Sequence, residues 1–364
     1  MKVAILQAQV GIDGHSRVLG EIVAAVNELG VTPDIFTLST EPQWRSWLGV
    51  LMQGRPLRVA FPAAARLPLV HAYAYQTVAH NWLVRNALRG YDVIVNSNDF
   101  VGFLPTEPRR VHYFHFPLRA SFRLVTGDGG QVQPAVASSA RWAVERADRD
   151  LQPGDVVLAN SRFTRDQVRQ LWPDASVDVV YPPVDLPQTL TDGQRDIDVV
   201  TLGNIAADKR QLEQVELAAT MPEHRFAILG AVKSGSYARQ VERAVRTKGL
   251  SNVTLLFDAS PQQVSAHLAR ARVFLHMKEF EQFGISVAEA IAHGCVPMVH
   301  DSGGQVELVT DPALRFRSPA DLPQMLRDAL AGQIPEPGYM HELRARVRDL
   351  APECFRSRIR DVLR

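Results

Sequence analysis

Short apolar runs alternate along the chain with longer segments in which apolar residues recur every three or four positions. The first run is followed by a loop containing Gly11 and Gly14, and then by a helical pattern whose apolar face extends over residues 18–29. Strands joined through helices pack as a parallel sheet, so this half predicts a Rossmann-like domain. The strands predicted in it cover residues 3–7, 34–38, 91–95, 111–116, 155–160 and 177–181.

The same alternation starts again after a polar connector, VDLPQTLTDGQR, at residues 184–195. Proline and glycine in a polar segment are typical of a domain boundary. We therefore predict an α/β protein with one Rossmann-like domain over residues 1–183 and a second over 184–345. The strands predicted in the second domain cover residues 197–202, 226–229, 253–257, 273–275 and 296–299.

The segment between the last two strands carries most of the candidate chemistry. A polar loop leads to Gly284, a helical pattern follows and ends at Gly294, and the second strand leads into the turn Asp301-Ser-Gly-Gly, which we expect to leave room for a ligand. Free N–H groups at a helix start attract phosphate. Glu281 lies before this helix and Glu289 within it, and carboxylates accept hydrogen bonds from sugar hydroxyls.

These motifs resemble those of a known family. The spacing E-x₇-E in EQFGISVAE, followed by HGCVPMVHDSGGQVELV, resembles the donor site of the retaining glycosyltransferase family 4, which has the GT-B fold. With YPPVD at 181–185, the chain looks most like the GDP-mannose-dependent α-1,2-mannosyltransferases of dolichol-linked oligosaccharide assembly. The resemblance implies two domains facing across a cleft. It also implies a C-terminal helix, about 346–364, that crosses back to the first domain and is anchored by Cys354 and Phe355.

The resemblance also assigns residues to the donor. Lys209 matches a family lysine that binds the pyrophosphate, whereas Asn204, after Gly203, stands where relatives have arginine. Either Arg210 or the N–H groups of Gly284 and Ile285 would then compensate for that arginine. Glu289 is assigned to the ribose, and Glu281 and His115 to the sugar.

Two features of the first domain complete the predicted site. HYFHFP resembles the family motif in which a histidine reaches the donor sugar, which selects His115; His112 would replace it only if the strand register slipped. The loop GIDGHS offers Gly14 and His15 to the acceptor and the donor phosphates, or else is a plain tight turn. It lacks G-x-G-x-x-G, so we expect no redox cofactor.

Charge and composition restrict the classes of partner that we expect the protein to bind. The net charge of +1 over 364 residues gives no general attraction to nucleic acid, and two cysteines do not indicate a disulfide framework. Residues 42–91 contain no Asp or Glu but six arginines, with three tryptophans among them. They predict an anionic or lipid-linked acceptor, or peripheral contact with an anionic membrane. Alternatively, this is a chance acid-poor surface whose aromatic residues belong to the core.

The N-terminus leads directly into a strand, and no run of ~20 apolar residues occurs, so we expect a cytoplasmic protein, peripheral at most. Two Asp-x-Asp triplets, at 148–150 and 196–198, lie away from strand ends that could hold a ligand, so no metal site is predicted. With the family resemblance, which implies retention and GDP-mannose, the sequence favours a metal-independent transferase that moves a hexose from GDP-mannose, or from a UDP-hexose, to a hydroxyl. A non-catalytic sugar- or partner-binding protein and a sugar-nucleotide epimerase are the alternatives.

Overall fold

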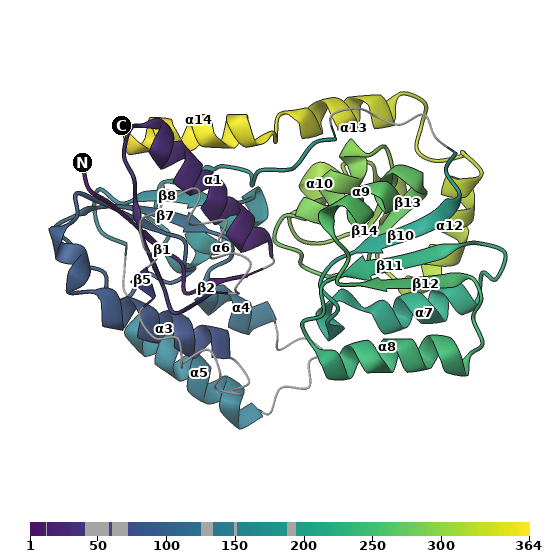
Figure 1. The fold of residues 1–364 in the computed structure, drawn as a ribbon, viewed down its shortest axis with the longest axis horizontal. Helices are drawn as coiled ribbons and strands as arrows, with labels where there is room; N and C mark the ends of the chain where they lie inside the picture. Colours follow the sequence, from purple (N-terminus) through teal and green to yellow (C-terminus); the bar gives the residue numbers. More distant parts are fainter. Residues whose placement is uncertain (12, 41–57, 60–71, 125–133, 149–150, 188–193) are drawn as a thin grey trace. The chain divides into compact units, whose positions relative to one another are not determined.

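The computed structural model describes the chain except residues 12, 41–57, 60–71, 125–133, 149–150 and 188–193 (Figure 1). It divides into two compact units: unit 1 is residues 1–183 with 352–364, and unit 2 is residues 184–351. The last segment returns to unit 1 at Pro352 and not at about 346, because residues 339–364 form two helices. The first ends at Arg348, and a second begins at Pro352, where proline fits a first helical turn.

Unit 1 contains a seven-stranded parallel sheet in the order β5-β3-β1-β6-β7-β8-β9. Strands β1, β6 and β8 are runs of mostly buried apolar residues, as expected for a parallel sheet covered on both faces, whereas β7 also carries Arg109, Arg110 and His112. The strands are β1 Val3–Leu6, β3 Asp34–Thr37, β5 Arg58–Val59, β6 Val93–Asn96, β7 Arg109–Phe114, β8 Val156–Ala159 and β9 Val177–Val179, with β2 Gln9–Val10 and β4 Ser39–Thr40 as a separate pair.

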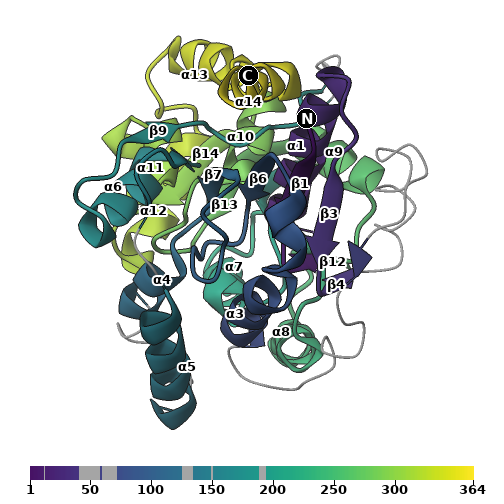
Figure 2. The same ribbon diagram turned by 90° about the vertical axis from the view of Figure 1, so that its left-hand side faces the viewer.

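Helix α1, Gly14–Glu28, lies along helix α14, Pro352–Leu363 (Figures 1 and 2). Phe355 is buried edge-on against Tyr113 of the sheet, and Arg356 pairs with Glu21 and Glu28 of α1 at 2.7 and 2.8 Å. The expected crossing back to the first domain is therefore present. Phe355 anchors it, but the assignment of Cys354 was wrong: that side chain is exposed, one position along the helix from the buried face. The other helices of this unit are α3 Ala72–Val84, η2 Ala87–Gly90, α4 Leu118–Leu124, α5 Pro134–Ala147 and α6 Arg162–Leu171.

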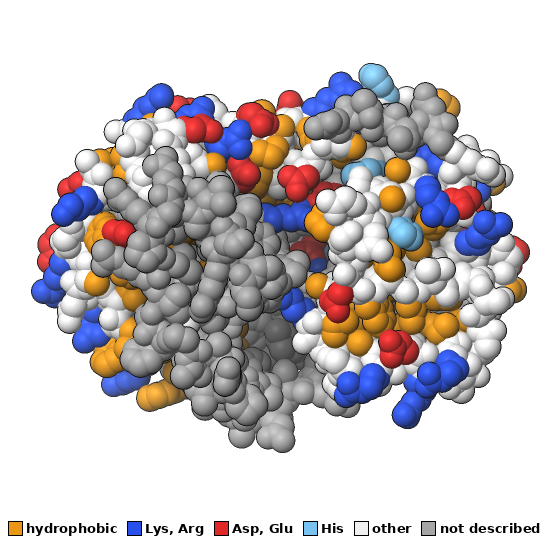
Figure 3. Space-filling view, in the orientation of Figure 1, with side chains coloured by type: hydrophobic (Ala, Val, Ile, Leu, Met, Phe, Trp, Pro, Cys, Tyr) orange, Lys and Arg blue, Asp and Glu red, His pale blue; other side chains and the backbone are white. Residues whose placement is uncertain are grey.

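Unit 2 contains a six-stranded parallel sheet in the order β12-β11-β10-β13-β14-β15. Half-buried apolar residues of the edge strand β12 pack toward α8, Gly235–Thr247. In Figure 3 apolar side chains form a band on the right-hand side, with Lys and Arg side chains below it. The strands are β10 Ile197–Leu202, β11 Phe226–Gly230, β12 Val253–Phe257, β13 Ala271–His276, β14 Val296–His300 and β15 Arg315–Phe316. The helices are η3 Ala207–Lys209, α7 Gln211–Ala219, α8 Gly235–Thr247, α9 Pro261–Arg270, α10 Ile285–Ala292, α11 Gln305–Leu308, η4 Pro312–Leu314, η5 Pro319–Asp321, α12 Leu322–Leu330 and α13 Tyr339–Arg348.

A buried ion pair joins β7 to the start of β8. Arg110 donates two hydrogen bonds of 2.7 Å to Asp155, and His112 Nε2 lies 3.3 Å from the same carboxylate. Burial would raise the pKa of Asp155, but the hydrogen bonds of His112 and Arg110 lower it to about 2. The stability that this lowered pKa contributes is complete above about pH 4 and is lost as the pH falls toward the folded-state value.

We expect Asp155→Asn to lower the free energy of unfolding at pH 7 by about 2 to 4 kcal/mol, because Arg110 would lose its buried partner. Urea unfolding at pH 7 and at pH 3 measures this, and the difference from wild type should shrink at the lower pH. Asp166→Asn, at an exposed surface pair, is the control. Equal loss at both pH values would contradict the ion-pair explanation.

Candidate active site

A cluster of charged side chains lies at the carboxyl ends of two neighbouring strands of unit 2. Strands β10 and β13 pair directly, so the loops that follow them meet although about 70 residues separate them. Lys209, after β10, donates a 2.6 Å hydrogen bond to Glu281 Oε2, after β13. His276 Nε2 lies 3.1 Å from the same oxygen, and Lys278 Nζ lies 3.8 Å from it. The structure thus brings together the predicted residues Lys209 and Glu281.

The cluster keeps Glu281 ionised. Burial alone would raise its pKa, but the charges of Lys209 and Lys278 hold the pKa of Glu281 well below its ordinary value. Burial lowers the pKa of His276, so that ring is neutral at pH 7 and supplies a hydrogen bond but no charge. Burial also lowers the pKa of Lys209, against the opposing effect of Glu281. The result is an ionised carboxylate between two ammonium groups.

Helix α10 begins beside this cluster without a side-chain cap. Its N-cap is Gly284 at φ 100°, ψ 58°, a left-handed conformation that glycine adopts without strain, and Ile285 is its first helical residue. The first N–H groups of a helix have no partner within the helix, so this start suits an anion. Glu289 is buried on the same helix, four residues after Ile285, and therefore lies on the same face one turn further along.

The loop after β10 contains position 204, where relatives have arginine and this chain has asparagine. Arg210 lies at φ 59°, and its guanidinium binds Glu279 at 2.7 Å and Glu213 at 3.3 Å. The stem of Lys209 lies against Gly203, where an added Cβ would be 3.6 Å from its Cδ, and the backbone carbonyl of Asn204 accepts a bond from Gln211. Arg210 is thus engaged with two carboxylates, which does not favour it as the replacement.

The glycine turn after β14 has a different role from the one expected. A Cβ on Gly303 would lie 2.3 Å from the Glu281 carbonyl oxygen, and one on Gly304 would lie 2.1 Å from that of Gln282. The Gly304 N–H donates to the Glu281 carbonyl at 2.7 Å. The prediction of ligand room against this turn was therefore wrong at these two positions, since the Glu281 loop itself fills that space and is held there.

A second cluster lies at the end of β7 in unit 1. His115 follows the strand, its Nε2 is 2.9 Å from Ser97 Oγ, and its ring lies 4.0 Å from that of His15. Asp99 Oδ1 accepts the N–H groups of His115 and Phe116, and its Oδ2 lies 3.7 Å from His15 Nε2. Burial holds the pKa of His115 well below its ordinary value, so it is neutral at pH 7.

The two residues expected in the GIDGHS loop both lie in helix α1. Gly14 is its first residue and His15 its second, because Asp13 caps the helix by accepting the Ser16 N–H at 2.9 Å. Sequence reasoning missed Asp99, which lies at φ 55°, a conformation uncommon outside glycine and frequent at functional sites. The polar run NSND, which begins at Asn96, the last residue of buried strand β6, was the available signal.

His112 is a core histidine. Its ring is buried between Asn96, at 3.1 Å, and Asp155, at 3.3 Å. Side chains alternate along a strand, so His112 and Phe114 share one face, whereas Tyr113 and His115 point the other way. The register therefore places His112 apart from the His15–His115 pair.

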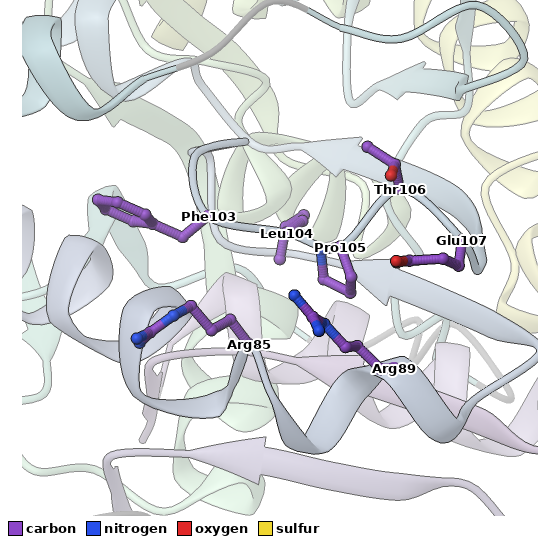
Figure 4. Close-up of a pocket in the computed structure, with 7 residues that line it drawn as sticks. All are labelled: Arg85, Arg89, Phe103, Leu104, Pro105, Thr106 and Glu107. Carbon is purple, nitrogen blue, oxygen red and sulfur yellow. The ribbon is translucent and has the colours of Figure 1, made fainter.

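A separate hollow of about 300 Å³ lies on unit 1 (Figure 4). Arg85 and Arg89 lie on one side of it and residues 103–107 on the other, and it contains none of the predicted site residues. In the described part of the chain, no group of three or more His, Cys, Asp or Glu side chains is placed to hold a metal ion.

Family models match both halves of the chain. Residues 12–188 match the model Glycosyltransferase Family 4, and residues 187–349 match Glycosyl transferases group 1. Among curated proteins, the GDP-Man:Man(3)GlcNAc(2)-PP-Dol alpha-1,2-mannosyltransferases of Caenorhabditis elegans and Mus musculus are 25% and 28% identical over 43% and 41% of this chain. The matches cover only 38% and 35% of those relatives. The GDP-mannose:cellobiosyl-diphosphopolyprenol alpha-mannosyltransferase of Xanthomonas campestris is 25% identical over 54% of this chain and 53% of its own length.

Solved structures match over nearly the whole chain. WaaG, a glycosyltransferase of lipopolysaccharide biosynthesis, is 16% identical with a TM-score of 0.72, over 99% of both chains. Anabaena Alr3699/HepE in complex with UDP and glucose is 14% identical with a TM-score of 0.71, over 100% of this chain and 99% of its own. Sucrose-phosphate synthase of Thermosynechococcus elongatus is 16% identical with a TM-score of 0.74, over 100% of this chain and 98% of its own. At such identities the matches establish the fold, which is GT-B. The chain therefore joins a Glycosyltransferase Family 4 domain to a Glycosyl transferases group 1 domain, and it belongs to the GT-B glycosyltransferases that these two families describe.

Proposed function

We propose that this chain transfers a hexose from a nucleoside-diphosphate sugar to an acceptor hydroxyl, with retention of anomeric configuration. The observation that carries the proposal is the cluster of Lys209 and Glu281 beside the uncapped start of α10. A lysine and free helix N–H groups are the protein groups that suit a diphosphate, and an ionised carboxylate suits sugar hydroxyls. The cluster offers both within one loop system.

Each group has a defined task on this account. Lys209 and the N–H groups of Gly284 and Ile285 bind the diphosphate and stabilise the negative charge that it gains as the glycosidic bond breaks. Glu281 accepts hydrogen bonds from the hexose, and Glu289 from the ribose. The leaving phosphate accepts the proton of the attacking hydroxyl, so the protein contributes positioning and charge, and neither a protein base nor a metal ion is required.

GDP-mannose is the donor that we favour, and a UDP-hexose is second. The curated relatives named above use GDP-mannose, and the Anabaena protein was solved with UDP. A thermal-shift screen of GDP, UDP, GDP-mannose and UDP-glucose tests the proposal. A ligand at a hundred times its Kd adds about 2.7 kcal/mol to the folded state, which gives an easily measured rise in Tm.

The screen should single out one nucleoside diphosphate and its sugar, and that sugar should then pass to an added hydroxyl acceptor. If none of the four raises Tm, the protein is not a transferase of this donor class. Conversion of the donor to its epimer without any acceptor would identify an epimerase instead. Binding of the donor with neither epimerisation nor transfer to any acceptor tried would favour a non-catalytic protein.

His115 remains assigned to the hexose. We expect His115→Ala to lower kcat about a hundredfold or more, because the ring would contact the donor sugar and position it, and also to lower Tm, because the ring is buried against Ser97 and His15. The control is His112→Asn on the same strand, which should lower stability and leave kcat within a factor of three at a temperature where it is folded. Equal kcat values for His115→Ala and wild type would remove His115 from the site.

We propose an anionic or lipid-linked acceptor reached at a membrane surface. The named relatives act on dolichol- and polyprenol-diphosphate acceptors. Most of the arginine-rich segment 42–91 lies outside the described residues. In its described part, Trp82 is 48% exposed with Arg85 4.4 Å from its ring, whereas His80 is buried in the core. Helix α5, which packs on α3, presents Trp142 at 64% exposure. No helix in the described ranges is both long and apolar enough to cross a bilayer.

Exposed tryptophan beside arginine suits the interface of an anionic membrane. We expect the protein to float with vesicles containing anionic phospholipid at low salt, and the variant Trp82→Ala with Trp142→Ala to lose at least half of that binding. Vesicles of neutral phosphatidylcholine are the control. Flotation unchanged by the double substitution would exclude Trp82 and Trp142 as the membrane contact.

A further inference from the structure

Lys278 is a second cation at the cluster that the family motif does not account for. It lies in the loop between β13 and α10, its side chain is 18% exposed, and that of Lys209 is 17% exposed. Its Nζ is 3.8 Å from Glu281 Oε2 and 3.4 Å from Asp208 Oδ2. Lys278 therefore joins the loops after β10 and β13 from the same sheet edge as Lys209.

The distances from Lys278 Nζ to the neighbouring carboxylates are longer than the distance from Lys209 Nζ to Glu281. Lys209 is within hydrogen-bond distance of Glu281, at 2.6 Å. Both separations of Lys278 exceed the range of about 2.7–3.2 Å that N–H···O bonds prefer. An ammonium group has three N–H donors, so Lys278 is held near two carboxylates by charge and can still donate short bonds to another acceptor.

The charge balance of the cluster indicates what that acceptor is. Two lysines surround the carboxylate of Glu281, the neighbouring His276 is neutral, and Asp208 is 58% exposed, so its charge is largely screened by water. The other buried carboxylate of the site, Glu289, lies one turn along α10. Around Glu281 itself, the two ammonium groups therefore exceed the carboxylate charge by one. A nearly buried unbalanced cation next to uncapped helix N–H groups favours an anionic ligand over an empty site.

Arg210 and the residue at position 204 are less suited to supply the second cation. Arg210 binds Glu279 and Glu213, and position 204 carries a neutral asparagine. We propose that Lys278 binds the donor diphosphate together with Lys209 and supplies the charge that Asn204 lacks. This inference rests on the proposed function and adds a donor-binding residue to it.

The test compares a diphosphate with its phosphate-free nucleoside. Calorimetry would measure the Kd of GDP and of guanosine, or of UDP and uridine if the screen selects uridine, for wild type, Lys278→Met and the control Lys248→Met. Lys248 forms a surface pair with Glu216 in the same unit. We expect the Kd of the diphosphate to rise about tenfold to a hundredfold in Lys278→Met, because a charge-assisted hydrogen bond is lost. The nucleoside Kd should stay within a factor of two, and Lys248→Met should match wild type.

A purely structural role predicts a different pattern, in which diphosphate and nucleoside affinities fall together. A rescue variant separates the roles further: Asn204→Arg in the Lys278→Met background should recover most of the diphosphate affinity. If Lys278→Met does not fold, Lys278→Gln takes its place, since it keeps a polar, hydrogen-bonding end without the charge. Unchanged diphosphate affinity in a folded Lys278 variant overturns this inference alone, whereas wild type that binds no nucleoside diphosphate overturns the proposed function itself.

Discussion

Glutamine in place of Glu281 is expected to lower kcat at least a hundredfold and to destabilise the protein by about 3 kcal/mol or more. The side chain is 12% exposed, and its charge lies between Lys209 and Lys278. Removing one member of a buried ion cluster leaves the others uncompensated, which typically costs about 3–5 kcal/mol. The catalytic loss follows because the sugar would lose a charged hydrogen-bond acceptor, and because Lys209 would lose the partner that orients it.

Steady-state kinetics and urea unfolding measure the two effects. The control is Glu279→Gln, two residues away, whose side chain is 45% exposed and pairs with Arg210. It should change stability by less than about 1 kcal/mol. Adding Lys278→Met to Glu281→Gln should recover part of the lost stability, since it removes one of the two uncompensated cations. Full additivity of the two losses would contradict the charge balance described for the cluster.

Alanine at Gly304 is expected to disrupt the same site through the backbone. The new Cβ would lie 2.1 Å from the Gln282 carbonyl oxygen, and Gly304 has an ordinary φ of −77°, so the cost comes from the close approach and not from dihedral strain. Relieving the overlap means moving the loop that carries Glu281. Overpacking of this kind typically costs about 1–3 kcal/mol. We expect donor affinity to fall at least tenfold as well.

A matched glycine separates this effect from the general consequences of a Gly→Ala change. Gly235 is the first residue of α8 in the same unit, and a Cβ there would meet only the guanidinium of Arg239 at 3.5 Å. Gly235→Ala should be neutral or slightly stabilising, because alanine favours the helix. Donor affinity that survives Gly304→Ala would show that the loop can shift without harm to the site.

The strands and the glycine-started helix could be predicted because their signals are local. Buried apolar runs such as Val273–Leu275 mark central parallel strands, and Gly284 marks the start of α10. The assignment of His115 to the donor sugar rests on the family motif and stays a prediction; alternation along the strand only separates its side chain from that of His112. Each of these depends only on neighbours in the sequence.

The contacts that define the site depend on which strands pair, and the sequence pattern does not state this. Lys278 meets Asp208 only because β13 lies beside β10. Asp99 meets His15 only because β6 lies beside β1 and α1 follows β1. The tight packing of Gly303 and Gly304 on the Glu281 loop also depends on strand pairing. For this reason the sequence pattern predicts space for a ligand at a glycine turn that the Glu281 loop fills.

A crystal structure of the protein with GDP-mannose, or with the UDP-hexose that the screen selects, would show whether the donor diphosphate binds where the loop of Glu281 turns into helix α10. We predict the phosphates within hydrogen-bond distance of Lys209, Lys278 and the first N–H groups of α10, with Glu281 on the hexose and Glu289 on the ribose. A nucleotide bound elsewhere, for example in the hollow beside Arg85 and Arg89, would show that the start of α10 is not the donor site.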